Sequence, residues 1–337
     1  MDVAVVGGCL LTGLRDVTND LTALDRPGHG RWAVVLPFDG PAVCARFDHS
    51  VPASATAVPT PPPPISRAAW VSSLDRDGFS KGVAAVREAV RAGDVYQVNL
   101  CRRLSAPLPA GYDIVGLGAA LARHNPAPFA ATVRVDSAGL AVASASPELF
   151  LRRRDDRVET RPIKGTTAPG AGFLAKDRAE NVMIVDLMRN DLGRVCRFGS
   201  VDVPDLCREE RHPGVSHLVS TVRGRLRPGV GWAELLAATF PPGSVTGAPK
   251  LAALDVIRRL EPVPRGVYCG AVGWVDAGSG DGDLNVAIRS FWAEYGRLHL
   301  GTGGGITWDS TPEGEWEETE LKARRLLAVA AGAALGA

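Results

Sequence analysis

Apolar side chains recur at two different spacings along the chain, and each spacing predicts a different kind of element. Positions three and four residues apart, as on one face of a helix, occur in six segments. The predicted helices are 78–93, 113–125, 177–193, 231–240, 248–260 and a last one from about Glu315 onward. Alternating or continuous apolar runs predict strands in 1–50, 94–106, 129–135, 140–146, 148–154, 214–226, 266–276 and 284–306. Because these elements follow one another without regular βαβ alternation, their order favours an α+β fold.

One segment interrupts this pattern. Residues 52–64, PASATAVPTPPPP, are rich in proline, which favours extended polyproline geometry. They are therefore predicted to form a surface linker. We divide the chain into a short β-rich segment, 1–64, packed on the same fold, and a large domain, 65–337, which is long enough to bury its own core.

Composition narrows the classes of function. A net charge of +1 gives no reason to expect a nucleic-acid or membrane-surface partner. The six cysteines are scattered without a Cys-x-x-Cys pair, which argues against zinc and against a disulfide scaffold and fits the reduced cytoplasm. The apolar stretch AVVGGCLLTGL near the start is too short to span a bilayer and lacks a basic leader. Neither a signal peptide nor a transmembrane helix is predicted.

The sequence lacks the motifs of many common enzyme classes. No phosphate loop, metal-binding histidine cluster, Gly-x-Ser-x-Gly elbow or dinucleotide fingerprint is present. Lys164 lies in a short predicted turn, RPIKGT, where its amine is either a solvated charge or a nucleophile. Glu148, in SASPELF, is either a solvated carboxylate or, if burial raises its pKa, a general acid.

Two glutamates on separate predicted helices form a candidate metal site. Oxygen ligands such as Glu180 and Glu318 suit Mg²⁺, which keeps several waters and binds the anion of its substrate. Each glutamate also has an ordinary interpretation. Asp177 and Glu180 resemble a capping box, and Glu318 and Lys322 are spaced as a surface ion pair. Spacing alone favours the ordinary interpretations.

Two glycine-containing segments and two isolated polar residues are further candidates for binding an anion. SVTGAPK, 244–250, opens a helix whose N-terminus either binds an anion or is capped by Thr246. GTGGGI, 301–306, either cradles a carboxylate with its amides or forms a tight turn. Arg289 interrupts an apolar predicted strand and needs an anionic partner, whereas a lone histidine such as His217 is more often a satisfied core residue.

Taken in order, these segments resemble the motifs of one family. SASPELF, RPIKGT, KDRAENVMIVDLMRNDLGRV, HLVST, GSVTGAPK, CGAVGW, AIRS, GTGGGI and EWEETELKARRLL are similar to segments of the chorismate-binding enzymes. That family includes the anthranilate, aminodeoxychorismate, isochorismate and salicylate synthases. The resemblance spans Gly93 to about Leu327. It implies an α+β fold of two large facing antiparallel sheets flanked by helices, with the site between them.

Two positions narrow the resemblance to one branch. Anthranilate synthases carry Ala in the PI-x-GT segment, whereas aminodeoxychorismate synthases carry Lys, as this chain does at Lys164. Isochorismate and salicylate synthases carry a lysine base where this chain has Gln97. The resemblance therefore points to aminodeoxychorismate synthase component I (para-aminobenzoate synthase component I), which acts in 4-aminobenzoate and folate biosynthesis.

The resemblance also implies roles. Lys164 would attack C2 of chorismate, Glu148 would protonate the departing 4-hydroxyl, and ammonia would add at C4 to give 4-amino-4-deoxychorismate. Glu180 and Glu318 would hold the Mg²⁺ that binds the ring carboxylate. His217 is placed with the catalytic residues, close to the ring. The residues implied to bind the substrate are Gly165, Thr166, Thr246, Arg289, Gly303, Gly304 and Lys322.

Several expectations concern partners and alternatives. The chain shows no glutamine amidotransferase segment, so ammonia is expected from a separate amidotransferase subunit in a heterodimer. The region before Gly93 is short for the family and has no convincing match to its tryptophan-binding motif. Two other functions stay open: anthranilate synthase component I or another chorismate-utilising enzyme, and an inactive paralogue that binds chorismate or an amidotransferase. Retention of Lys164, Glu148, Glu180 and Glu318 argues against the inactive paralogue.

Overall fold

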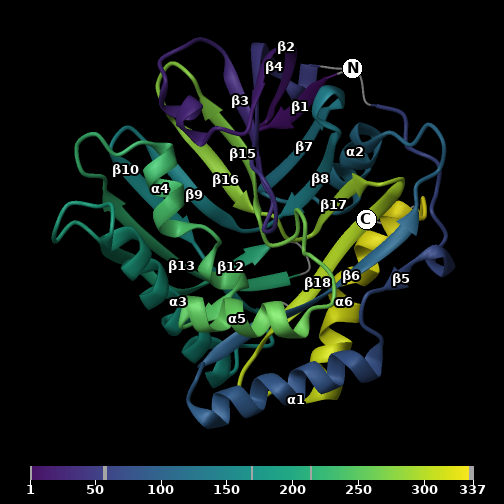
Figure 1. Cartoon of the computed structure of the whole chain (residues 1–337), viewed down its shortest axis with the longest axis vertical. Coiled ribbons are helices and arrows are strands. Elements are labelled where there is room, and N and C mark those ends of the chain that lie inside the picture. The colour runs from purple at the N-terminus through teal and green to yellow at the C-terminus, as the bar shows by residue number, and fades with distance from the viewer. Residues whose placement is uncertain (1, 56–58, 168–169, 213–214, 334–337) are drawn as a thin grey trace.

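Figure 1 shows a computed structural model of the chain, which describes residues 2–55, 59–167, 170–212 and 215–333. All six predicted helices are present. They are α1 (Arg76–Ala92), α2 (Ile114–His124), α3 (Ala175–Gly193), α4 (Trp232–Thr239), α5 (Lys250–Leu260) and α6 (Pro312–Ala330). Within the described ranges, none of these helices is long and apolar enough to cross a membrane.

Local sequence sets the ends of these helices. At the start of α1, the Asp75 carboxylate accepts a hydrogen bond from the Gly78 amide at 2.8 Å. At its end, Gly93 adopts a φ of 84°, a conformation that glycine reaches without strain. The last helix, α6, starts at Pro312, slightly before the predicted Glu315, because the Thr311 hydroxyl accepts from the Gly314 amide and caps it.

The described strands form an 18-stranded sheet in which every pairing is antiparallel. They are β1 (Val3–Val6), β2 (Cys9–Thr18), β3 (Arg31–Leu36), β4 (Val43–Pro52), β5 (Val71–Ser72), β6 (Gln97–Pro107), β7 (Phe129–Val135), β8 (Leu140–Ser146), β9 (Leu149–Arg154), β10 (Arg157–Arg161), β11 (Ile163–Thr167), β12 (Asp202–His212), β13 (Val215–Arg225), β14 (Gly247–Ala248), β15 (Ala271–Asp276), β16 (Gly282–Val286), β17 (Ser290–Glu294) and β18 (Arg297–Ile306).

The sheet has two halves. One runs β5–β6–β18–β17–β8–β7, and the other runs β3–β15–β16–β9–β10–β13–β12. The halves meet where the Asn285 side chain on β16 donates to the Phe129 carbonyl on β7 at 2.7 Å. The predicted α+β fold with two large antiparallel sheets is confirmed. The strands β1, β2 and β4 link the two halves into one hydrogen-bonded set.

The N-terminal segment is therefore built into the sheet. Within the proline-rich stretch, 56–58 lie outside the described residues, and 59–64 form no regular structure and are mostly exposed. Thr60 packs against Gly116 on α2, where an added Cβ would lie 2.2 Å from the Thr60 carbonyl oxygen. These residues follow the surface of the fold, whereas the division of the chain at residue 64 stays a prediction.

Several regions differ from the pattern-based prediction. The single strand predicted over 284–306 is three strands, because Arg289 and Tyr295 adopt φ values of 51° and 49° that interrupt the extended backbone. The strand predicted from Gly266 begins only at Ala271. The apolar pattern gives no sign of β10 and β12, whose charged residues mask the alternation.

Among the described residues, three hydrophobic clusters hold the helices on the sheet. The largest includes the fully buried Trp232 of α4 and Phe47 of β4. The second joins α2 and α6 to β8, β17 and β18, and the third joins α1 and α5 to β6. The paired strands β6 and β18 therefore lie between helices, and Figure 1 shows α6 alongside β18.

Candidate active site

Lys164 lies on a strand, so the turn predicted for RPIKGT is wrong. The strand β11 pairs with β13, and the register shifts between Ile163 and Thr166. Gly165 takes up this irregularity with a φ of 82°, and an added Cβ there would lie 2.9 Å from a side-chain carbon of Asp177. The segment is a bulged strand because β13 supplies hydrogen-bonding partners that a turn would leave unused.

The Lys164 amine points into the protein. Its Nζ donates a hydrogen bond to the carbonyl oxygen of Ser244 at 3.0 Å. Burial lowers the pKa of Lys164, although the carboxylates of Glu180 and Glu148 oppose this shift. The alternative of a solvated surface charge is therefore wrong.

Glu148 is a second buried ionisable group beside Lys164. It lies between β8 and β9, is only 3% exposed, and its Oε1 has no hydrogen-bond partner among the described residues. Burial raises its pKa to about 7, although the Ser244 hydroxyl and the charge of Lys164 counteract this. A solvated carboxylate is excluded, and near neutral pH this carboxyl group is partly protonated.

Glu180 on α3 and Glu318 on α6 approach the same lysine from two helices. Gln97 on β6 donates from Nε2 to Glu180 Oε2 at 3.4 Å. Burial raises the pKa of Glu180, and Lys164 opposes that shift. The ammonium of Lys322 lies 2.6 Å from Glu318 Oε1 and lowers the pKa of Glu318.

Both ordinary interpretations of these glutamates are partly right. The Asp177 carboxylate does cap α3, accepting from the Leu174 amide at 2.9 Å, but Glu180 takes no part in this cap. The Glu318–Lys322 ion pair exists and its side chains are about half exposed, at 47% and 45%. Lys322 also donates to the Gly303 carbonyl oxygen at 2.9 Å, which ties the pair to β18.

A third carboxylate on this side, Glu315, has no place in the sequence-based interpretation. It is 6% exposed, and the Ser310 hydroxyl donates to its Oε1 at 2.6 Å. Burial raises its pKa. An added Cβ on Gly304 would lie 2.8 Å from Glu315 Oε2 and 3.7 Å from Glu318 Oε1, so both acids face β18. The i,i+3 spacing of the two acids on one helix is the signal that could have found it.

The glycine run of GTGGGI lies within β18, so the tight turn predicted for it is wrong, and the binding of a carboxylate by its amides stays a prediction. Gly303 and Gly304 pair with Cys101 and Leu100 of β6. An added Cβ on Gly303 would lie 2.5 Å from the Leu100 carbonyl oxygen. Glycine is required because the neighbouring groups approach the backbone so closely.

Arg289 lies between strands, in the break between β16 and β17, and not within a strand as predicted. Burial lowers its pKa, and Glu148 is the carboxylate that opposes the shift. Within the described part of the chain its guanidinium forms no ion pair, which leaves it available to an anionic ligand. The predicted need for an anion is thus met only weakly by the protein itself.

The remaining candidates border this cluster. His217 is 3% exposed on β13 and lies opposite Thr166 in the strand register, beside the bulge that carries Lys164. Thr246 is fully buried, and its hydroxyl is 3.2 Å from the carbonyl oxygens of Pro242 and Gly243. Thr246 does not cap α5, since Pro249 occupies the N-cap position.

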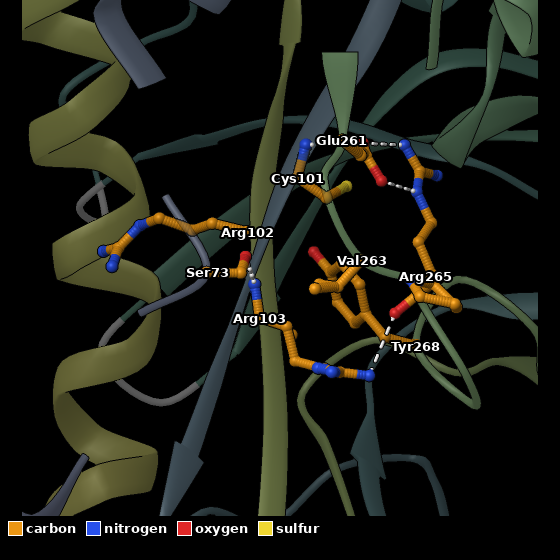
Figure 2. Close-up of a pocket in the computed structure, with 10 residues that line it drawn as sticks. Ser73, Cys101, Arg102, Arg103, Glu261, Val263, Arg265 and Tyr268 are labelled. Atoms are coloured by element: carbon orange, nitrogen blue, oxygen red, sulfur yellow. Dashed lines mark hydrogen bonds and ion pairs between the residues drawn. The ribbon is translucent and has the colours of Figure 1, made fainter. Parts of the chain in front are cut away.

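A buried ion pair supports the segment that holds Lys164. Figure 2 shows Arg265 and Glu261 facing each other, with hydrogen bonds of 2.6 and 2.8 Å. Arg265 also donates to the carbonyl oxygens of Val245 at 2.8 Å and Asn99 at 2.7 Å. The space beside it encloses only about 10 Å³, which is room for about one water. This pair therefore joins β6 to the Ser244 segment and leaves no room for a ligand.

Comparison with known proteins identifies the family. The sequence profile of the chorismate binding enzymes matches residues 39–328. The chain belongs to the chorismate-binding enzyme family. The chorismate-binding fold is also that of the crystal structure of anthranilate synthase component I from Streptococcus pneumoniae TIGR4, with a TM-score of 0.77, 25% identity, and coverage of 97% of this chain and 89% of that one.

Relatives of the chain include proteins with two different names. Aminodeoxychorismate synthase component 1 of Klebsiella aerogenes is 42% identical over 77% of this chain and 59% of its own length. The protein of the same name from Salmonella typhimurium is 38% identical over 88% of this chain and 68% of its own length. Anthranilate synthase component 1 of Streptomyces coelicolor is 42% identical over 77% of this chain and 52% of its own length. The chain thus spans 52% to 68% of the length of these relatives.

Two carboxylates of the candidate site fit the Mg²⁺ that the sequence resemblance implies. Glu180 and Glu318 offer carboxylate oxygens from two helices, and each raises the pKa of Lys164 against the effect of burial. In the described ranges no group of three or more His, Cys, Asp or Glu is drawn together as a ready metal centre. Mg²⁺ suits such an open pair, since it takes one or two carboxylates and completes its shell with water and substrate oxygens.

Proposed function

We propose that the protein aminates chorismate at C4 to give 4-amino-4-deoxychorismate, in 4-aminobenzoate and folate biosynthesis. The observation that carries this proposal is the amine of the partly buried Lys164, held on the Ser244 carbonyl oxygen, beside the buried carboxyl group of Glu148. The names of the Klebsiella aerogenes and Salmonella typhimurium relatives support the same activity.

Lys164 would act as the nucleophile. An amine attacks only when neutral, and burial lowers the pKa of Lys164 and so enlarges the neutral fraction. Its nitrogen forms a bond to C2 while both conjugated ring double bonds shift, from C1=C2 to C1=C6 and from C5=C6 to C4=C5, and the bond between C4 and the hydroxyl breaks. The Ser244 carbonyl oxygen, 3.0 Å from Nζ, holds the amine in place for this step.

Glu148 would act first as acid and then as base. Hydroxide is a poor leaving group, so Glu148 donates its proton and the hydroxyl departs as water. Ammonia then forms a bond to C4, the bond between C2 and Lys164 breaks, and the amine leaves neutral. The Glu148 carboxylate takes a proton from the new C4 ammonium, which restores the starting state. A pKa of about 7 suits both directions of transfer.

Cationic groups would hold the two carboxylates of the substrate. Arg289 lacks a protein ion pair in the described ranges, and Lys322 lies beside Glu318 at the edge of β18. Mg²⁺ bound by Glu180 and Glu318 would neutralise the ring carboxylate. The pocket around the substrate would be lined by Gly165, Thr166, Gly303, Gly304, Thr246 and His217.

A separate glutamine amidotransferase subunit would supply the ammonia in a heterodimer. The words "component 1" in the relatives' names imply a second component in those proteins, which supports this proposal. Co-purification from the source cell tests it. Full glutamine-dependent activity of this chain alone, without an amidotransferase, would contradict it.

A second candidate is the anthranilate synthase reaction, which releases pyruvate. It is favoured by the Streptomyces coelicolor relative, which is as similar as the aminodeoxychorismate synthases. The two candidates differ at Lys164, because an amine that attacks C2 directs the incoming nitrogen to C4. Product analysis therefore separates them.

The decisive experiment is mass spectrometry of the products from chorismate, Mg²⁺ and ammonium. We expect aminodeoxychorismate without pyruvate from the native protein, and a loss of at least about a thousandfold for Lys164→Ala. Lys81→Ala is the matched control, since Lys81 is exposed on α1 and pairs with Asp77. Anthranilate and pyruvate from the native protein, or an unchanged Lys164→Ala variant, would overturn the proposal.

A further inference from the structure

A second hollow lies on the sheet, away from the candidate active site. It encloses about 510 Å³ and is lined by Arg152, Arg154, Arg157, Val158, Glu159, Ser200, Asp202, Arg223, Gly224 and Arg225. These residues come mainly from β9, β10 and β13, which lie side by side in Figure 1. Arg154 is six residues along the chain from Glu148, or about 20 Å of extended strand. The hollow is therefore separate from Lys164 and its neighbouring carboxylates.

One row of side chains across this face neutralises itself. In the strand register, Asp283 lies opposite Arg152, Arg152 opposite Glu159, Glu159 opposite Arg223, and Arg223 opposite Asp202. Opposite charges alternate along the whole row, and directly opposed residues on neighbouring strands share a face of the sheet. Ion pairs form at both ends, with Arg152 2.9 Å from Asp283 and Arg223 2.9 Å from Asp202.

The next row along the same strands consists of arginines. Arg154 lies opposite Arg157, and Arg157 lies opposite Arg225. Like charges placed directly opposite each other destabilise a sheet. In the neighbouring row, two residues away on each of these strands, positive and negative side chains alternate. The strand register therefore does not force like charges to lie opposite each other.

The three arginines differ in their partners. Arg154 is held by Asp283 at 2.8 Å and by the Gly282 carbonyl oxygen at 2.9 Å. Arg225 is held by Asp156 at 3.1 Å. Arg157, between them, is exposed and has no carboxylate partner in the described part of the chain. The outer two guanidinium groups are fixed, and the central one is free to bind.

We propose that this arginine row is a binding site for a small polyanion that carries at least two phosphate or carboxylate groups. Adjacent strands are about 4.8 Å apart, so the three guanidinium groups span about 10 Å, which suits two linked anionic groups. Arginine donates in pairs to such oxygens, and the fixed outer residues reduce the entropy lost on binding. A hollow of 510 Å³ has the size of a small-molecule site.

Isothermal titration calorimetry with pyrophosphate and, separately, with citrate tests this proposal. The two probes distinguish phosphate from carboxylate recognition. The variant is Arg157→Gln, which removes the central cation from an exposed position. The control is Arg189→Gln on α3, which loses the same charge outside the hollow.

We expect at least one probe to bind the native protein and Arg189→Gln equally, and Arg157→Gln at least about tenfold more weakly. Binding should weaken as salt rises. Without a probe, Arg157→Gln should melt at the same temperature as the native protein or higher, because a like-charge contact is removed. Absence of binding by both probes at low salt, or equal binding by Arg157→Gln, would overturn the proposal.

Discussion

Two clusters of charged residues contact neighbouring residues of the segment Ser244–Val245, and they differ in how completely their polar atoms are hydrogen-bonded. Arg265 and Glu261, which are 2% and 6% exposed, form two hydrogen bonds with each other. Arg265 also binds the Val245 carbonyl oxygen. One residue earlier, the Ser244 carbonyl oxygen accepts a hydrogen bond from Lys164. Beside that lysine, Glu148 has an oxygen with no partner in the described ranges.

The difference separates a structural ion pair from a reactive site. Arg265 and Glu261 use their polar atoms on each other and on the backbone, so little is left for a ligand. Around Lys164, burial lowers the pKa of the lysine and raises the pKa of Glu148, so both groups favour their neutral forms. Buried polar groups without full hydrogen bonding destabilise the fold. Groups with strongly shifted pKa values occur most often at active sites.

Breaking the structural pair should have the largest effect on stability. Arg265→Met leaves Glu261 buried without its cation, so we expect the free energy of unfolding to fall by about 3–5 kcal/mol in urea denaturation. Activity should fall as well, because the Ser244 segment loses its anchor.

The control for this prediction is the double variant Arg265→Met with Glu261→Leu. Replacing both charges by apolar groups should restore much of the lost stability. By contrast, Lys164→Ala should leave stability unchanged or raise it. A Lys164→Ala variant as unstable as Arg265→Met would mean that both clusters are structural.

Removing the acid of the reactive cluster should mainly affect the rate. For Glu148→Gln we expect turnover to fall by about 10²–10⁴-fold, the usual contribution of a general acid. Native activity should decline as pH rises through about 7, because Glu148 loses the proton that it donates. The measurement is kcat/KM from pH 6 to 9 at a fixed concentration of free ammonia. A Glu148→Gln variant that keeps the same decline would assign it to another group.

The same carboxyl group should make stability depend on pH. Its pKa is raised from 4.5 to about 7 in the folded protein, so the folded state binds the proton more tightly than the unfolded state. Its contribution to the free energy of unfolding is therefore fully present below about 4.5 and is lost as pH rises through about 7. The loss is about 3 kcal/mol.

The difference in unfolding free energy between native protein and Glu148→Gln measures this term. Glutamine cannot ionise, so the variant should gain on the native protein between pH 5 and 8. A difference that stays constant over this range would show that Glu148 keeps an ordinary pKa.

Much of the fold was predictable from the sequence because it depends on local pattern. The helix from Arg76 buries one apolar side and has clear ends, and the helix from Ala175 buries Ile184, Val185, Met188 and Leu192 at helical spacing. The apolar strands β6 to β9 alternate or run continuously. Strands β10 and β12 were not predicted, because their charged side chains hide the apolar alternation. Their extended backbone depends on hydrogen bonds to the neighbouring strand β13.

The residues of the candidate site were predictable from the sequence, but their burial and their hydrogen-bond partners were not. Resemblance to the chorismate-binding enzymes pointed to Lys164, Glu148, Glu180 and Glu318, whereas spacing alone favoured ordinary interpretations for the glutamates. Glu315 escaped although its i,i+3 spacing from Glu318 was visible, because that spacing is also typical of a solvated helix face.

The sequence by itself determined the types and positions of the chemical groups, and with them the family. Only the tertiary structure decided which of those groups are buried, and whether they are paired. Arg265 and Lys164 are both cations in a chain with a net charge of +1. One is matched by a buried carboxylate four residues away, and the other meets a backbone carbonyl and acids from three separate segments. That distinction comes from packing between segments that are far apart in the sequence, because this packing excludes water and shifts each pKa. The local sequence pattern does not predict it.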